Sequence, residues 1–547
     1  MQDFQIPFLL KSPTFLPKTL DNFIEKCGAP RLLINKNRRL RRQIFFDWRR
    51  FFMLPVNCGS HADYQHFVVT NLRKYYPNPN AFARSTWDII ERFWNLDLSF
   101  TDTFMADKYS KFGPAPRTPS SMQRSYLLSI DFKVTSITDW AAQLKINPLY
   151  AILSGFEPGN TPGVGTFYDF INRLWNSDDD HMSPHIHPLK TKVKKPKTKG
   201  TKADSVEKVT VAKLLPVLEN TNFKLDEQPY SSLFKIYQNE FLDISVSTGL
   251  IHSDALALAG DGTPIVTSHR ERKKRICTCK ENGITDCKCD RYFSQPDCDI
   301  GWDSSRDCYY HGYDLYMLVD SQSDLPVFPH FSCASKHDSH GFLHAFFRMK
   351  SFLPDYTVSK VLLDSAHDAM PYYQYFKREN ITPFIDLNGK GGRPPVYKND
   401  FTIDKDGVPV CPSGCRMRRD GVEVAKGRMK FKCPKISHKN GCISCSCETP
   451  CSDAKYGRTV HLVMKDNPRL FNNPPRSSKE WKLEYNARTS AERSNKREKL
   501  DFKLEDDRHR STKMWYCRLY HILMLQHLDA WDLPFESPLK KLILNVA

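Results

Sequence analysis

Two aspartates are placed where a carboxylate needs a specific partner. Asp261 follows the apolar segment LALAG, and Asp364 directly follows KVLL, so both acids should lie at the ends of buried strands. A carboxylate at the core end of a strand is costly unless it meets a cation, which makes metal ligation an economical explanation. For Asp364 a helix N-cap is an equally good explanation, because a helix could begin near Ala366. The nearby acids that could take over the metal role are Asp254 and Asp368.

A third carboxylate comes from the segment EYNARTSAERSNKREK, residues 484 to 499. In a helix, at about 100° per residue, positions separated by three, four and seven residues fall in one stripe roughly 60° wide. The residues with this spacing are Tyr485, Arg488, Glu492 and Lys499, and Lys496 joins the same face. An ordinary helix surface also scatters charges of both signs, so the spacing alone does not establish a site.

Two aspartates and one glutamate would supply the hard oxygen ligands that a pair of Mg²⁺ ions needs, with Mn²⁺ as the alternative metal. Two such ions activate a hydroxyl nucleophile and stabilise the leaving oxygen in phosphodiester displacement. The bases beside Glu492, which are Arg488, Lys496 and Lys499, would then neutralise backbone phosphates of DNA, and Tyr485 would stack or hydrogen-bond at the strand.

The pattern Y-x2-R-x3-E-x6-K resembles the YREK signature of DDE insertion-sequence transposases, whose catalytic domain is RNase H-like. The blocks AGDGTPI and LLDSAHD precede it in the expected order and at strand ends, and the resemblance covers residues 250 to 530 approximately. It implies that Asp261, Asp364 and Glu492 form the catalytic triad. The long gap between the last two acids resembles family members that carry an insertion before the glutamate helix.

The resemblance implies an enzyme that binds the terminal inverted repeats of its own element, hydrolyses a strand at each end with two Mg²⁺, and joins the freed 3′-OH to target DNA. Coupling two DNA ends implies at least a homodimer, in the cytoplasm of a prokaryotic cell and at the nucleoid when bound to DNA. Two other hypotheses are open: a catalytically silent, domesticated transposase that only binds DNA, and a metal-dependent nuclease without strand joining.

Composition favours a polyanionic partner. The 547 residues carry a formal charge of +18, with 80 basic and 62 acidic residues, which points to nucleic acid. No run of about 18 apolar residues exists, and the first residues, MQDFQIPFLLKSPTFLPK, resemble neither a signal peptide nor an anchor. We therefore expect a soluble, intracellular protein that does not engage a membrane.

The expected fold class is α/β: an RNase H-like mixed sheet with helices, preceded by a mainly helical amino-terminal domain and interrupted by a Cys-rich insertion. Strands are predicted at 256–266, 309–320, 325–335 and 358–368, with an antiparallel start and later helix-then-strand crossovers. The expected domains are 1–175 (helical, with a basic run at 35–50 that could bind DNA ends), 176–206 (basic flexible linker), 207–390 and 459–547 (catalytic domain), and 391–458 (insertion). Residues 511–531 should form a closing helix that packs on the sheet, with its Met, Trp and Leu residues in the core.

The sequence allows two starting points for the helix that carries Glu492. SSKE (477–480) and TSAE (489–492) both have the capping-box pattern, so the helix begins either before Tyr485 or only near Ser490. In the second case Tyr485 and Arg488 belong to the approaching loop.

Thirteen of the 17 cysteines fall in two windows, 277–308 and 411–451, which favours reduced thiols over spread disulfides. We expect Zn²⁺ in the second window, whose cysteines are Cys411, Cys415, Cys433, Cys442, Cys445, Cys447 and Cys451. For the first window, with the two CxC pairs of CTCKENGITDCKCD, zinc is somewhat less favoured than free thiols. The spacing does not select four ligands.

Overall fold

The structure is a computed structural model that describes residues 59–78, 82–110, 115–183, 186–187, 209–267, 274–275, 277–289, 291–292, 295–389, 401–439, 442–448, 450–454, 456–506, 509–531 and 538–544. The chain divides into two compact units, Met1–Asn57 with Tyr109–Pro116, and Cys58–Lys108 with Arg117–Ala547. All helices and strands given below belong to the second unit. The basic run at 35–50 and most of the predicted linker lie outside the described residues.

Helices form the described amino-terminal region. They are α3 (His61–Tyr75), α4 (Arg84–Asn95), α5 (Ser99–Met105), α6 (Pro119–Asp131), α7 (Ile137–Ile146), α8 (Pro148–Ser154) and α9 (Val164–Leu174). Helix α6 is almost fully buried and packs against α17 (Thr512–Ala530). The contact includes an edge-on pair of Tyr126 and His521, whose ring centroids are 4.5 Å apart. This helical region therefore shares a core with the carboxy-terminal helix.

A mixed sheet forms the centre of the second unit. Its strands are β2 (Leu256–Val266), β5 (Asp299–Asp303), β6 (Cys308–Asp320), β7 (Pro326–Cys333), β8 (Val358–Leu363) and β9 (Thr382–Ile385). The order is β5-β6-β2-β8-β9, with β7 also paired to β6. β6 is antiparallel to β2, β5 and β7, whereas β2 with β8 and β8 with β9 are parallel. The predicted α/β class with an antiparallel start is confirmed.

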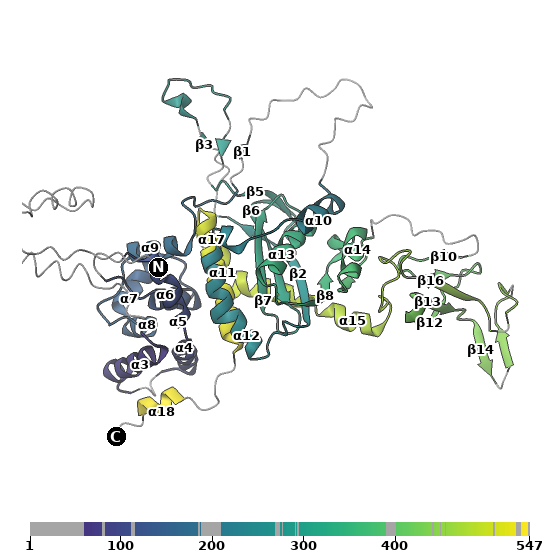
Figure 1. The fold of residues 1–547 in the computed structure, drawn as a ribbon, viewed down its shortest axis with the longest axis horizontal. Helices are drawn as coiled ribbons and strands as arrows, with labels where there is room; N and C mark the ends of the chain where they lie inside the picture. Colours follow the sequence, from purple (N-terminus) through teal and green to yellow (C-terminus); the bar gives the residue numbers. More distant parts are fainter. Residues whose placement is uncertain are drawn as a thin grey trace, which may run out of the picture. The chain divides into compact units, whose positions relative to one another are not determined.

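Helices connect and cover the parallel strands, as crossover connections require. α13 (Asp338–Phe352) joins β7 to β8 and packs on β6, β7 and β2, and α14 (Met370–Arg378) joins β8 to β9 (Figure 1). Helix α17 is the predicted closing helix: Ser511 caps it, and its residues Trp515, Leu519 and Met524 are fully buried. α17 packs beside α11 (Ser231–Tyr237), which precedes a π-helical turn, η4 (Gln238–Leu242), and α12 (Asp243–Ser247).

The Cys-rich insertion is built from short strands: β10 (Thr402–Ile403), β11 (Pro409–Val410), β12 (Arg418–Glu423), β13 (Arg428–Lys432), β14 (Ile436–Lys439), β15 (Cys442–Cys445) and β16 (Thr459–Val463). β12, β13 and β16 form one sheet, which extends beyond residue 458. This part has an apolar cluster of its own, including Met429, Phe431, Leu462 and Phe471. Burial of apolar side chains thus contributes to its folding independently of any metal.

The remaining described elements are short. α10 (Val211–Glu219) packs on α13 and α14, and α18 (Pro538–Leu544) packs on α3. A three-stranded sheet of order β1-β4-β3 joins β1 (Ile186–His187), β3 (Lys274–Arg275) and β4 (Arg291–Tyr292). Within the described part of the chain, every helix is too short or too polar to cross a lipid bilayer.

Candidate functional site

The register between β2 and β8 brings the two predicted aspartates together. The parallel strands pair Leu258 with Val361 and Ala259 with Leu362. Continuing this register by two residues sets Asp261 beside Asp364, the residue that follows β8. The expected strand-end position is correct for Asp364 but wrong for Asp261, because β2 continues to Val266. Since alternate residues of a strand face the same side, both carboxylates emerge on one face of the sheet. Helix α16 (Thr489–Lys496), which carries Glu492, packs on β2 and β6.

The three predicted catalytic acids interact electrostatically. Burial, followed by the negative charge of Asp338, raises the pKa of Asp261 to about 7; Asp364 and Glu492 add to this rise, and Arg488 opposes it. A carboxylate surrounded by other carboxylates is protonated more easily because their repulsion disfavours its charge. A cation bound among these groups would remove that repulsion, and all three are hard oxygen donors of the kind that Mg²⁺ binds.

Asp364 is an N-cap and a member of the acidic cluster at once. Its Oδ1 accepts hydrogen bonds from the Ala366 amide (3.1 Å) and from His367 Nδ1 (2.6 Å). The predicted cap is therefore present, on a short 3₁₀ turn, η6 (Ser365–His367). Burial opposes its ionisation, but these hydrogen bonds and the charge of His367 hold the pKa of Asp364 below its usual range. Both bonds end on Oδ1, so Oδ2 can accept a further partner.

His367 connects Asp364 to the sheet, and the sequence analysis did not identify it. Its ring is 1% exposed, and Nε2 lies 3.0 Å from the Tyr316 hydroxyl on β6. Gly260 leaves room for the Tyr316 side chain in this hydrogen-bond network, because a Cβ at position 260 would lie 2.7 Å from the Tyr316 hydroxyl oxygen. The signal in the sequence was a histidine three residues after the aspartate in LLDSAH.

The glutamate segment forms two helices instead of one. α15 (Lys479–Asn486) is capped by Ser478, whose side chain accepts from the Trp481 amide, and α16 begins at Thr489 without a side-chain cap. The first predicted helix start is thus correct within one residue. The TSAE capping box is wrong, because the Thr489 hydroxyl donates to the Asn486 carbonyl. After α16 a π-helical segment, η8 (Arg497–Asp501), changes the helical phase before Lys499.

The predicted DNA-binding side chains differ in their surroundings. Arg488 Nη2 donates to Glu492 Oε1 at 2.6 Å, and its guanidinium lies 5.8 Å from the ring centroid of Tyr485. Tyr485 itself stacks on Trp481, at 4.5 Å between ring centroids. Lys496 is exposed. Lys499, which we expected at phosphates, is largely buried and donates to the Pro264 carbonyl of β2 at 2.7 Å, with Glu505 Oε1 at 3.2 Å.

Two more aspartates belong to this region and were not identified from the sequence. Asp338 is the first residue of α13, and Asp314 is a buried residue of β6. A Cβ at Gly262 would lie 2.9 Å from Oδ1 of Asp338 and 3.2 Å from Oδ1 of Asp314. Burial, together with Asp338 and Asp261, raises the pKa of Asp314 well above its usual range. These two aspartates could not be found from the sequence because their position depends on the β2–β6 register, which no local sequence pattern contains.

Neither fallback aspartate is suited to metal binding. The Asp368 side chain is fully buried, pairs with Arg469, and accepts from the Asn388 amide at 2.7 Å and the Tyr373 hydroxyl at 3.0 Å. Asp254 is exposed in the turn before β2. Asp368 is therefore a structural residue that attaches the segment after the insertion to the sheet.

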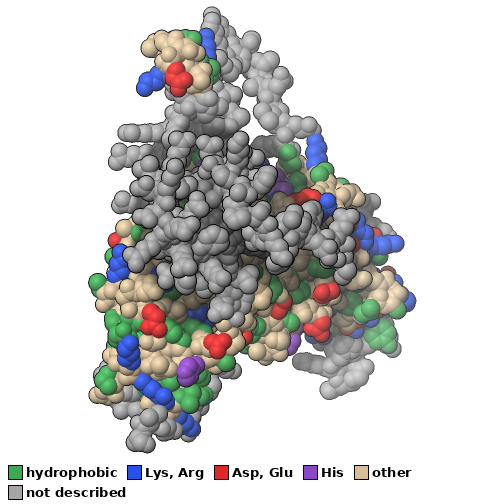
Figure 2. All heavy atoms as spheres, turned by 60° about the vertical axis from the view of Figure 1, so that its left-hand side comes forward, with side chains coloured by type: hydrophobic (Ala, Val, Ile, Leu, Met, Phe, Trp, Pro, Cys, Tyr) green, Lys and Arg blue, Asp and Glu red, His purple; other side chains and the backbone are tan. Residues whose placement is uncertain are grey.

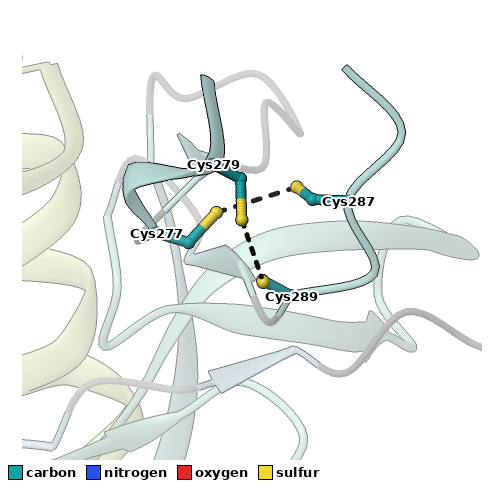
Figure 3. A group of neighbouring side chains, drawn as sticks. All are labelled: Cys277, Cys279, Cys287 and Cys289. Carbon is teal, nitrogen blue, oxygen red and sulfur yellow. Dashed lines mark hydrogen bonds between the residues drawn. The ribbon is translucent and has the colours of Figure 1, made fainter. Parts of the chain in front are cut away.

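Four cysteines of the first window form a metal-capable group, which the sequence analysis had ranked below the second window. The Sγ atoms of Cys277, Cys279, Cys287 and Cys289 all lie within 4.8 Å of one another and could hold a metal such as zinc (Figure 3). Within the described ranges this is the one cluster of such ligands. The three predicted catalytic acids do not form such a close group, and Glu492 pairs with Arg488.

The second cysteine window is only partly covered by the described side chains. Cys411 is buried and its amide donates to the Cys415 carbonyl at 3.0 Å. Hydrogen bonds from Cys415 and Cys451 help to lower the pKa of Cys411, against the effect of its burial. The side chains of Cys442 and Cys445 lie outside the described residues. Zinc binding by this window, including Cys433 and Cys447, stays a prediction.

Neither a protein-family model nor a curated protein matches this chain. The transposase resemblance therefore stays a prediction. On the face drawn in Figure 2, described basic and acidic side chains are interspersed, so the surplus positive charge is not gathered in one described patch there.

Proposed function

We propose that this chain is a DDE transposase: an enzyme that cleaves DNA phosphodiester bonds at the ends of an insertion sequence and joins the freed 3′-OH to target DNA. The observation that carries the proposal is the parallel register of β2 and β8, which continues to Asp261 and Asp364, together with the electrostatic effect of both Asp364 and Glu492 on Asp261. An antiparallel start followed by two parallel strands also supports the RNase H-like fold implied by the resemblance.

Each side chain of the site has a separate role in the proposed reaction. Asp261, Asp364 and Glu492 would hold two Mg²⁺ ions, or Mn²⁺. When bound, the metals supply activation of a hydroxyl nucleophile and stabilisation of the leaving oxygen. His367 fixes the orientation of the Asp364 carboxylate through Oδ1, and Arg488 holds Glu492 near the sheet. Arg488 and Lys496 also provide positive charge for DNA backbone phosphates.

The partners follow from the reaction. The enzyme would bind terminal inverted repeats and target DNA, act as at least a homodimer because two ends are joined, and work at the nucleoid of a prokaryotic cell. Net charge supports DNA as the partner, since +18 favours association with a polyanion.

Cleavage and joining of the DNA that flanks the gene is the test. We would incubate the purified protein with Mg²⁺ and labelled duplexes from both flanks, then supply a pre-cleaved 3′-OH end with a target plasmid. Asp261→Asn, Asp364→Asn and Glu492→Gln should each abolish cleavage and keep DNA binding. Asp254→Asn, an exposed acid outside the site, is the matched control and should cleave normally.

The alternatives give different results. Cleavage by the wild type without any joined product would identify a nuclease, and end binding without cleavage would identify a silent DNA-binding protein. Normal cleavage by Asp364→Asn would remove the proposed triad.

A further inference from the structure

The four cysteines of the first window sit on a hairpin between β2 and β5. Its arms are β3 and β4, which pair antiparallel with Arg275 opposite Arg291. After β3, Cys277 caps the short 3₁₀ turn η5 (Thr278–Lys280), and this turn contains Cys279. Cys287 and Cys289 lie on the returning stretch that leads to β4 (Arg291–Tyr292). The loop between β3 and β4 therefore brings the two CxC pairs into one four-sulfur group.

Two of the sulfur–sulfur distances match those of a metal tetrahedron, and all of them lie within 4.8 Å. Sγ of Cys277 lies 3.7 Å from that of Cys287, and Sγ of Cys279 lies 3.6 Å from that of Cys289. A tetrahedral Zn²⁺ with Zn–S bonds of about 2.3 Å places its sulfurs about 3.8 Å apart. A disulfide would need about 2.05 Å. Figure 3 shows the four sulfurs pointing toward a common centre from the two arms.

Few of the described side chains of the hairpin are buried. Between Cys277 and Cys289 the exposed residues include Ile284, which is 50% exposed, and Cys287 is the buried side chain of this stretch. The turn is closed by Gly283, at φ +74°, and by a hydrogen bond from the Ile284 amide to the Cys279 carbonyl (2.8 Å). A segment that buries so little apolar surface gains scant stability from packing, so a metal–thiolate centre is the interaction that can order it.

We propose that Cys277, Cys279, Cys287 and Cys289 bind one Zn²⁺ ion as a structural site that is separate from the carboxylates and independent of the proposed reaction. Each thiol binds as a thiolate and releases its proton to solvent. Four protein ligands close the coordination sphere, which leaves no open position for chemistry. The metal fixes the two arms of the hairpin, and through the β4–β1 pairing it also fixes Ile186–His187, on the chain that follows α9.

Metal analysis tests the proposal without any activity assay. Protein purified under reducing conditions without chelator should lose one zinc per chain in the Cys279→Ser/Cys287→Ser variant. Cys308→Ser, an exposed cysteine at the start of β6 outside the group, is the matched control and should keep the wild-type content. Zinc bound by the second window would add equally to all three proteins. An unchanged zinc content in the double variant overturns the proposal, as does iron with labile sulfide in place of zinc.

Differential alkylation keeps the test independent of folding of the variants. In the wild-type protein the peptides carrying the four cysteines should resist alkylation until a strong chelator is added, whereas Cys308 should react at once. Fast alkylation of Cys277 and Cys287 before chelation would contradict zinc binding, and so would a disulfide between any of the four. Loss of DNA cleavage with zinc intact would affect only the proposed function.

Discussion

At the scale of single residues, His367 determines how Asp364 is presented. If it positions that carboxylate, His367→Ala should reduce Mg²⁺-dependent cleavage about 10- to 100-fold, the usual cost of losing a group that orients a metal ligand. The readout that separates positioning from stability is the Mg²⁺ concentration for half-maximal cleavage, which should rise. Tyr316→Phe, which removes only the distant hydroxyl, should have a smaller effect, and an unchanged Mg²⁺ dependence in His367→Ala would show a purely structural role.

A second residue-scale prediction concerns Glu498 in η8. Its side chain is fully buried, and Oε1 accepts from Ser494 and from Gln526 at 3.3 Å each. Burial raises the pKa of Glu498 from 4.5 to about 8. Because the folded state keeps a proton that the unfolded chain releases, the free energy of unfolding should fall as pH rises from about 4.5 to about 8.

The measurement is chemical denaturation of the wild type and Glu498→Gln at pH 6 and pH 8.5. The variant cannot ionise, so its stability should decline less over this interval, by up to about 1.4 kcal/mol per pH unit between the two pKa values. Glu157→Gln, at an exposed position, should follow the wild type. Parallel declines in wild type and Glu498→Gln would mean that this carboxyl does not titrate abnormally.

At the scale of elements, the glycines of β2 allow other groups to approach the strand. Gly260→Ala would put a Cβ 2.7 Å from the Tyr316 hydroxyl and 3.0 Å from Leu363 Cδ2. Such overpacking of a buried strand should lower the free energy of unfolding by about 1–3 kcal/mol. Gly165→Ala in α9 meets open space and serves as the control. Equal melting temperatures of the two variants would show that β2 tolerates the added methyl group.

Lys496 and Lys499 were both predicted to contact phosphates, but only Lys499 attaches η8 to β2. Lys499→Ala removes the bond to the Pro264 carbonyl and should cost about 1–2 kcal/mol of stability. Lys496 is exposed, so Lys496→Ala should spare stability and flatten the slope of log K against log salt for DNA binding by about one unit. A salt series for both variants decides: a flattened slope in Lys499→Ala alone would restore the original assignment of Lys499 as the phosphate contact.

At the scale of the whole molecule, the amino-terminal helices and the central sheet both pack against α17. His521 of α17 lies 3.1 Å from Gln123 of α6, and Arg92 of α4 pairs with Asp529 at the end of α17. A transposase that joins two DNA ends should place two such units on a pair of ends. Mass photometry with end duplexes should therefore show a species of two chains with two duplexes, which random DNA of equal length does not form. A single chain on each duplex at saturation would contradict the dimer.

Local patterns in the sequence indicated candidate positions for chemistry. An apolar run correctly placed Asp364 directly after a strand, the Met, Trp and Leu residues of 511–531 indicated a buried helix, and the net charge indicated a polyanionic partner. Asp261 was expected at a strand end but lies inside β2. These signals are local, because burial and helical periodicity are written in neighbouring residues. The same locality explains why the helix starts were only partly correct, since the capping pattern at 489–492 occurs in a chain that continues from α15 through αR conformations.

The tertiary structure alone decided which of these residues meet. The β2–β8 register sets Asp261 beside Asp364. Asp314 of β6 and Asp338 of α13 lie in the same region, next to Gly262. Arg469, which is 101 residues away in the sequence, forms hydrogen bonds with the Asp368 carboxylate. The loop between β3 and β4 likewise gathers four cysteines of the first window. Contacts between distant segments depend on strand register and helix packing. Because both arise from many weak packing interactions acting together, they leave no pattern in a short stretch of sequence.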